Sequence, residues 1–184
     1  MIAMTTMKPM EISFNADWFK SGYYIYILTI EHKEKGIFYY VGQTGDRKHV
    51  AARSPFYRLM GHFNTYNIKS GTDNQLVKGL IDNNLIDERT ADKNTRICVE
   101  EAIQSGTVTI KAHYYAISDF DSANHKAKRI FVEEVELALI TNFKKVGAKL
   151  FNNEAKIGDN KEVTNKEAIA LATEIFKKHC QLSQ

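Results

Sequence analysis

The sequence predicts an α+β domain in which a small antiparallel or mixed sheet of three strands is flanked by helices. Two segments rich in β-branched and aromatic residues, 23–30 and 37–41, are separated by a polar loop that ends in Gly36, which is typical of a β-hairpin. Further along the chain come segments with helical periodicity, then one segment in which apolar and polar residues alternate as in a strand, and then more segments with helical periodicity. This order favours helices that cover an antiparallel sheet over a parallel α/β arrangement.

The hairpin is expected to close over a five-residue loop, residues 31–35, with Ile30 paired to Gly36. Side chains alternate between the two faces of a strand, so an even sum of paired residue numbers places Tyr24 and Tyr40 on one face. A six-residue loop would separate the two tyrosines unless a bulge intervenes. The structure decides between the two registers directly.

A helix is expected to begin at Ser54-Pro55, because serine caps free amides and proline fits the first helical turn. Its apolar positions follow the spacing i, i+3, i+4, i+7 of a helix with one buried face: Phe56, Leu59, Met60 and Phe63. The remaining elements are expected as a third strand at 107–117 and as helices at 73–86, 95–104, 125–145 and 164–181.

The chain is expected to form a single domain with attached pieces. Residues 1–20 are an N-terminal arm, 21–153 the core with an insertion at 64–106, and 154–184 a C-terminal helical extension. Apolar residues make up 43% and charged residues 26% of the 184 residues, a globular composition.

The composition excludes several classes of protein. No apolar run approaches the roughly 20 residues that span a bilayer, and the first residues lack the pattern of a secretory signal. Cys98 and Cys180 are too few for a disulfide framework or a zinc site. A membrane protein, a secreted mini-protein and a zinc finger are therefore excluded, and a reducing cytoplasm is the expected location.

The net charge of +3 is weak, but residues 40–70 carry five basic side chains against one acidic side chain. A locally positive stretch favours a polyanionic partner, whereas ordinary solvated surface explains the same charges.

A set of short motifs follows in a fixed order along residues 21–153. They are Gly22-Tyr23-Tyr24, then Tyr39-Tyr40-Val41-Gly42-Gln43-Thr44, Arg58 and His62 in YRLMGHF, Glu136 in VELALITNF, and Asn152 in KLFNN. This set resembles the signature of the GIY-YIG nuclease family, although the first motif reads GYY. The intervals from Gly42 to Arg58 and from His62 to Glu136 are longer than in compact members, which is similar to the type II restriction-enzyme branch.

The resemblance implies a site that hydrolyses phosphodiester bonds. Tyr24 or His62 would accept the proton of the attacking water, and Tyr40 would position the reactants. Arg58 would hold the phosphate through two parallel hydrogen bonds. The alternative for both tyrosines is an ordinary place in the core, and for Arg58 an ordinary place on the surface.

Glu136 is embedded in an apolar helical run, where an ionised carboxylate is costly unless it is paired or bound to a cation. One carboxylate with waters and a substrate phosphate suits Mg²⁺, for which Mn²⁺ would substitute. The alternatives are a salt bridge to a basic residue and, if the helix is rotated, Glu133 as the ligand. Asn152 would support the metal site by hydrogen bonding, or belong to an ordinary turn with Asn153.

We therefore expect a Mg²⁺-dependent endonuclease for double-stranded DNA, in the style of a type II restriction enzyme, in a prokaryotic or phage context. A homodimer would match a palindromic target. One alternative is a structure-selective or nicking nuclease of repair or of a mobile element, and another is a catalytically inactive DNA-binding module. The expected contacts with DNA are Gln43, Arg47, Lys48, Arg53, Lys126, Lys128 and Arg129, although helix-end solubility explains the last three equally well.

Overall fold

The computed structural model describes residues 12–63, 74–86, 97–152 and 162–182. Within these ranges one sheet is built from β1 (Gly22–His32), β2 (Gly36–Gln43), β3 (Val108–Asp119) and β4 (Lys149–Leu150), in the order β3-β1-β2-β4. β1 runs antiparallel to β2 and β3, and β4 runs parallel to β2. The expected α+β class is confirmed, but the expected number of three strands is wrong, because the two-residue β4 is too short to leave a periodic pattern.

The described helices are η1 (Ala16–Phe19), α1 (Pro55–Phe63), α2 (Gln75–Asp82), α4 (His125–Lys145) and α5 (Lys166–Leu182). Residues 97–104 are helical as well. α4 has the expected bounds, whereas α2 is shorter than 73–86. It begins at Gln75, because the Asn74 side chain caps it by accepting hydrogen bonds from the amides of Leu76 and Val77, and it ends at Asp82, before Asn84 with its positive φ of 52°. Residues 64–73 and 87–96 of the expected insertion lie outside the described part. No described helix is long and apolar enough to cross a membrane.

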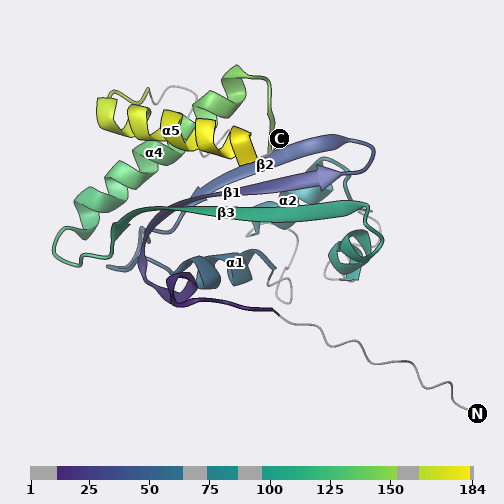
Figure 1. Cartoon of the computed structure of the whole chain (residues 1–184), viewed down its shortest axis with the longest axis horizontal. Helices are drawn as coiled ribbons and strands as arrows, with labels where there is room; N and C mark the ends of the chain where they lie inside the picture. The colour runs from purple at the N-terminus through teal and green to yellow at the C-terminus, as the bar shows by residue number, and fades with distance from the viewer. Residues whose placement is uncertain (1–11, 64–73, 87–96, 153–161, 183–184) are drawn as a thin grey trace, which may run out of the picture.

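The sheet lies between two layers of helices, with α4 and α5 over one face and α1 and α2 over the other (Figure 1). β1 is buried on both faces, as its sequence predicts. On one face Ile25 and Ile27 belong to an apolar cluster that includes Val135 of α4. On the other face Leu28 belongs to a second cluster that includes Leu76 of α2. The core is therefore divided by the sheet into two apolar clusters.

The β1–β2 hairpin is tighter than expected. His32 pairs with Gly36, which leaves the three-residue loop 33–35, and Gly36 has a φ of 83°. The His32 ring stabilises this loop, because its Nδ1 accepts hydrogen bonds from the amides of Glu34, at 3.1 Å, and Lys35, at 3.2 Å. The expected five-residue loop is wrong for this reason.

The tighter loop shifts the register by two residues. The expected pairing would have placed Tyr24 opposite Gly42, whereas the structure pairs Tyr26 with Gly42 and Leu28 with Tyr40. Both registers keep an even sum, so the same set of side chains lies on each face. The shift therefore moves Tyr26 into the position that the sequence analysis gave to Tyr24.

Candidate active site

A buried phenol lies at the centre of the candidate site. Tyr26 of β1 is fully buried, and its Oη accepts a hydrogen bond from Arg58 Nε at 2.9 Å. The same oxygen lies 2.9 Å from His62 Nε2, and the Arg58 Cζ lies 5.7 Å from the centre of the Tyr26 ring. One hydroxyl therefore joins a guanidinium and an imidazole.

α1 places Arg58 and His62 on one flank, because residues four apart lie one turn from each other on a helix. The helix begins at Pro55, where the Oγ of Ser54 accepts a hydrogen bond from the Tyr57 amide at 3.3 Å. Its last turn is fixed by Asn74, whose Nδ2 donates to the His62 carbonyl at 2.6 Å. The caps of two helices thus determine where the two side chains lie.

The protonation states follow from burial. Burial, and next the charge of Arg58, lower the pKa of His62 to about 3, so this ring is neutral near pH 7. Burial holds the pKa of Tyr26 well above its usual value, so the phenol keeps its proton. Since Arg58 can only donate, the Tyr26 hydroxyl accepts from it and can donate its own proton to His62 Nε2.

Tyr40 of β2 completes the aromatic part of the site. Its ring centre lies 6.0 Å from that of Tyr26 and 5.3 Å from that of His62. Burial raises the pKa of Tyr40. The charge of Arg58, and hydrogen bonds with Tyr26 and Arg58, act in the opposite direction but do not outweigh burial. Tyr40 is therefore a second protonated phenol beside the first.

Glu136 of α4 supplies the negative charge. Burial raises its pKa from 4.5 to about 7, although the charges of Arg58 and Arg47 act to lower it. Its charge acts in turn on Tyr26, Tyr40 and Arg58, which places all four side chains in one electrostatic environment. The positive charge of Arg58 is stabilised there: burial opposes it, but Tyr26, Tyr40 and Glu136 together raise its pKa. We call these residues the Tyr26 cluster: Tyr26, Tyr40, Arg58, His62 and Glu136.

The Glu136 carboxylate has no direct partner in the part of the chain that the structure describes. Among the described residues it takes part in none of the hydrogen bonds or ion pairs, so the salt-bridge alternative does not hold there. A desolvated carboxylate without a cation is costly, and its raised pKa is the measure of that cost. The described residues form no group of three or more His, Cys, Asp or Glu side chains that could hold a metal ion.

Asn152 supports the site through the backbone of Val41, the residue after Tyr40. Its Oδ1 accepts a hydrogen bond from the Val41 amide at 3.0 Å, and its Nδ2 donates to the Val41 carbonyl at 2.8 Å. The preceding Phe151 amide donates to the Tyr39 carbonyl at 2.8 Å. The Asn152 side chain thus continues the pairing of β4 with β2 by one residue and holds β2, the strand that carries Tyr40, in place.

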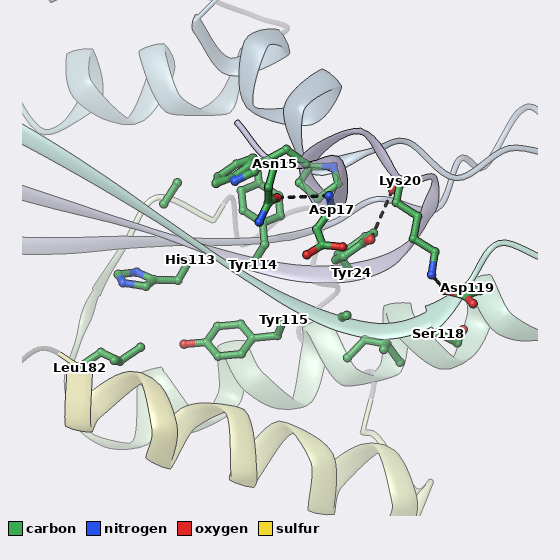
Figure 2. Close-up of a pocket in the computed structure, with 15 residues that line it drawn as sticks. Asn15, Asp17, Lys20, Tyr24, His113, Tyr114, Tyr115, Ser118, Asp119 and Leu182 are labelled. Atoms are coloured by element: carbon green, nitrogen blue, oxygen red, sulfur yellow. Dashed lines mark hydrogen bonds and ion pairs between the residues drawn. The ribbon is translucent and has the colours of Figure 1, made fainter. Parts of the chain in front are cut away.

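The structure does not bring Tyr24 into this cluster. Its hydroxyl donates a hydrogen bond to the Lys20 carbonyl at 3.3 Å. Burial raises the pKa of Tyr24, and the charges of Asp119 and Asp17 add to this effect, whereas the charge of Lys20 opposes it. Figure 2 shows Tyr24 in an open pocket of about 840 Å³ along β3, which contains none of the five cluster residues. The sequence analysis missed Tyr26, although Ile25-Tyr26 carries the last two letters of the GIY motif.

The expected DNA contacts are mostly engaged with acidic partners in this structure. Glu133 Oε1 accepts from Arg47 Nε at 2.7 Å and from Arg129 Nη1 at 2.6 Å. Arg53 pairs with Asp46 at 2.8 Å.

The other expected contacts differ in their environment. Lys128 lies 3.6 Å from the Asp121 carboxylate, and the Gln43 side chain closes a turn by hydrogen bonding to both backbone groups of Gly45. Lys48 and Lys126 are exposed. Glu133, the alternative ligand, accepts hydrogen bonds from two arginines, whereas Glu136 has no such contact with any described residue.

Comparison of the chain with protein-family models, with curated proteins and with solved structures found no match.

Proposed function

We propose that the protein is a Mg²⁺-dependent endonuclease that hydrolyses phosphodiester bonds of double-stranded DNA, in the style of a type II restriction enzyme. The contact of Arg58 and His62 with the Tyr26 hydroxyl carries this proposal. The Glu136 carboxylate, unpaired among the described residues, interacts electrostatically with Arg58. Hydrolysis needs a proton acceptor for water and positive charge at the phosphate. The Tyr26 cluster contains a group for each task.

The proton of the attacking water passes to Tyr26 Oη as Tyr26 releases its own proton to His62 Nε2. This relay needs no free phenolate, so the high pKa of Tyr26 does not oppose it. The pKa of His62, about 3, is lowered by burial and by the charge of Arg58. A phosphate bound to Arg58 offsets that charge and makes His62 a stronger base when substrate is present.

The phosphate is held by the Arg58 guanidinium, which can present two parallel donors to its oxygens. The Tyr40 hydroxyl donates a hydrogen bond to the same phosphate and so limits the orientation of the phosphate. A Mg²⁺ ion held by Glu136 would stabilise negative charge on the phosphate and on the leaving oxygen. The bond from phosphorus to the sugar oxygen breaks as the water oxygen attacks, and the leaving oxygen takes a proton from solvent.

The path of the DNA backbone follows from the charges near Glu136. Arg47 and Arg129 share the single Glu133 carboxylate, so the three side chains keep a net positive charge. A DNA phosphate would replace part of this carboxylate contact at the exposed Arg47. We place one flanking phosphate there, next to the scissile phosphate at Arg58.

Because one cluster cuts one strand, two copies on a palindromic target would cut both strands in the cytoplasm of a prokaryotic or phage-infected cell. Sedimentation of the protein alone and with DNA tests the dimer, and a monomer under both conditions contradicts it.

Incubation of phage DNA and supercoiled plasmid with the protein and Mg²⁺ tests the proposed activity. We expect reproducible fragments, lost on removal of Mg²⁺ and in Arg58→Lys, which keeps the charge but lacks the planar pair of donors. Nicked circles alone would favour the nicking alternative. DNA binding without cleavage, in Mg²⁺ and in Mn²⁺, would contradict the proposal and favour an inactive module.

A further inference from the structure

A third tyrosine lies against the Tyr26 cluster. Tyr114 of β3 pairs with Tyr26 across the β1–β3 ladder, and the two rings stack with centres 5.2 Å apart and planes 27° from parallel. Trp18 of the η1 helix contacts the Tyr114 ring at 5.6 Å with its plane inclined by 67°. Tyr114 is thus enclosed between the central phenol and the N-terminal segment.

The Tyr114 hydroxyl is buried and has no hydrogen-bond partner in the described part of the chain. Most buried polar atoms in proteins have a partner, and one without it costs free energy that a phenylalanine would avoid. The stack with Tyr26 would be equally available to phenylalanine, so packing does not account for the hydroxyl. The Tyr114 hydroxyl is therefore available for a hydrogen bond to a water molecule or to a substrate.

The geometry indicates where such a partner would lie. Two stacked phenols whose rings are 5.2 Å apart extend from neighbouring strands on the same face of the sheet. Because the two rings stack side by side, we take their hydroxyls to be close enough for one water to bind both, each O–H···O bond being about 2.7–2.8 Å long. Burial, opposed by the charge of Arg58, raises the pKa of Tyr114, so the hydroxyl remains a donor.

We propose that Tyr114 is a further catalytic residue, whose hydroxyl donates a hydrogen bond to the attacking water and holds it against Tyr26. This assignment rests on the proposed nuclease function. The water accepts from Tyr114 with one lone pair, gives a proton to Tyr26 Oη and attacks phosphorus with the other lone pair. The proton of Tyr26 passes to His62, and Tyr114 keeps its own, so the count of protons balances.

The neighbouring Tyr115 provides a matched control. It extends to the opposite side of β3 (Figure 2), and its hydroxyl lies 3.2 Å from Nδ1 of the buried His179. Tyr115→Phe removes a hydrogen bond that the fold uses, whereas Tyr114→Phe removes a hydroxyl that has no partner within the described ranges. The two variants differ from wild type by one oxygen atom each.

The test is the single-turnover cleavage rate at saturating Mg²⁺, together with the Kd for DNA without metal and the melting temperature. For Tyr114→Phe we expect a rate at least tenfold lower, a Kd within twofold of wild type, and a melting temperature equal or higher. For Tyr115→Phe we expect the wild-type rate and a lower melting temperature.

A Tyr114→Phe variant that cleaves at the wild-type rate overturns this assignment alone. Wild-type protein that never cleaves DNA overturns the proposed function, and the assignment with it. A lower rate accompanied by a lower melting temperature in Tyr114→Phe would show a structural role and also overturn the assignment.

Discussion

Tyr26 and Gly42 face each other across the β1–β2 ladder, and the phenol lies directly over the glycine. A methyl group at Gly42 would collide with the hydroxyl and the ring of Tyr26. The glycine of the second motif is thus explained by packing, because only a residue without a side chain allows the phenol to reach Arg58 and His62.

Substitution Gly42→Ala therefore displaces the Tyr26 hydroxyl. We expect a loss of stability of about 1–3 kcal/mol from overpacking, and a cleavage rate at least 100-fold lower because the contacts of Tyr26 Oη are broken. Chemical denaturation and single-turnover cleavage measure the two effects.

Gly61→Ala is the matched control, because a Cβ on this helical glycine would meet nothing within 4 Å. Alanine is the better helix former, so stability should rise by about 0.5–1 kcal/mol with cleavage unchanged. Equal effects of the two substitutions would contradict the packing role of Gly42.

Glu136→Gln should make the protein more stable and inactive. The pKa of Glu136 is raised from 4.5 to about 7 by burial, so the folded protein holds a proton that the unfolded chain releases between these values. Stability therefore falls as the pH rises through this window, by on the order of 3 kcal/mol above pH 7. The substitution should restore that amount at pH 8 and little at pH 4, with cleavage lost.

Thermal unfolding at pH 4 and pH 8, with and without Mg²⁺, measures this effect. We expect Mg²⁺ to stabilise the wild type at pH 8 and not Glu136→Gln, because only the carboxylate binds the ion. Glu134→Gln is the control, since its carboxylate is hydrogen bonded to Asn165 Nδ2 at 2.8 Å. A stability gain at pH 8 in the control but not in Glu136→Gln would contradict the assignment.

Asn152→Ala should slow cleavage through Tyr40. The variant loses both hydrogen bonds to the Val41 backbone, at a cost of about 1–3 kcal/mol, and releases the strand that positions Tyr40. Asn83→Ala removes a comparable hydrogen bond, from Asn83 Nδ2 to the Gly79 carbonyl at 2.8 Å, outside the Tyr26 cluster. If both variants lose similar stability, only Asn152→Ala should lose cleavage, by tenfold or more.

The parts of the site that the sequence predicts are those on regular helices. α4 has the expected bounds, and the apolar run around Glu136 correctly indicates a desolvated carboxylate. The spacing of four residues likewise places Arg58 and His62 on one flank of α1. Helical periodicity is a local property, so neither inference needs the tertiary structure.

The parts that the sequence does not predict depend on contacts between distant residues or on very short elements. The position of Tyr26 depends on the hairpin register, which the His32 ring fixes by binding two amides of the loop. β4 is two residues long, and its pairing with β2 arises only in the folded chain. Tyr24 and Tyr26 share strand and parity, so a shift of two residues exchanges them without any change in the hydrophobic pattern.

The central claim is that Tyr26, and not Tyr24, belongs to a DNA-cleaving centre. The most direct measurement compares the single-turnover rates of DNA cleavage in Mg²⁺ for wild type, Tyr26→Phe and Tyr24→Phe. We expect Tyr26→Phe to lower the rate at least 100-fold, since it removes the hydroxyl that joins Arg58 to His62. Tyr24→Phe, which loses only the 3.3 Å contact with the Lys20 carbonyl, should stay within threefold of wild type. An active Tyr26→Phe, or an inactive Tyr24→Phe, would contradict this account.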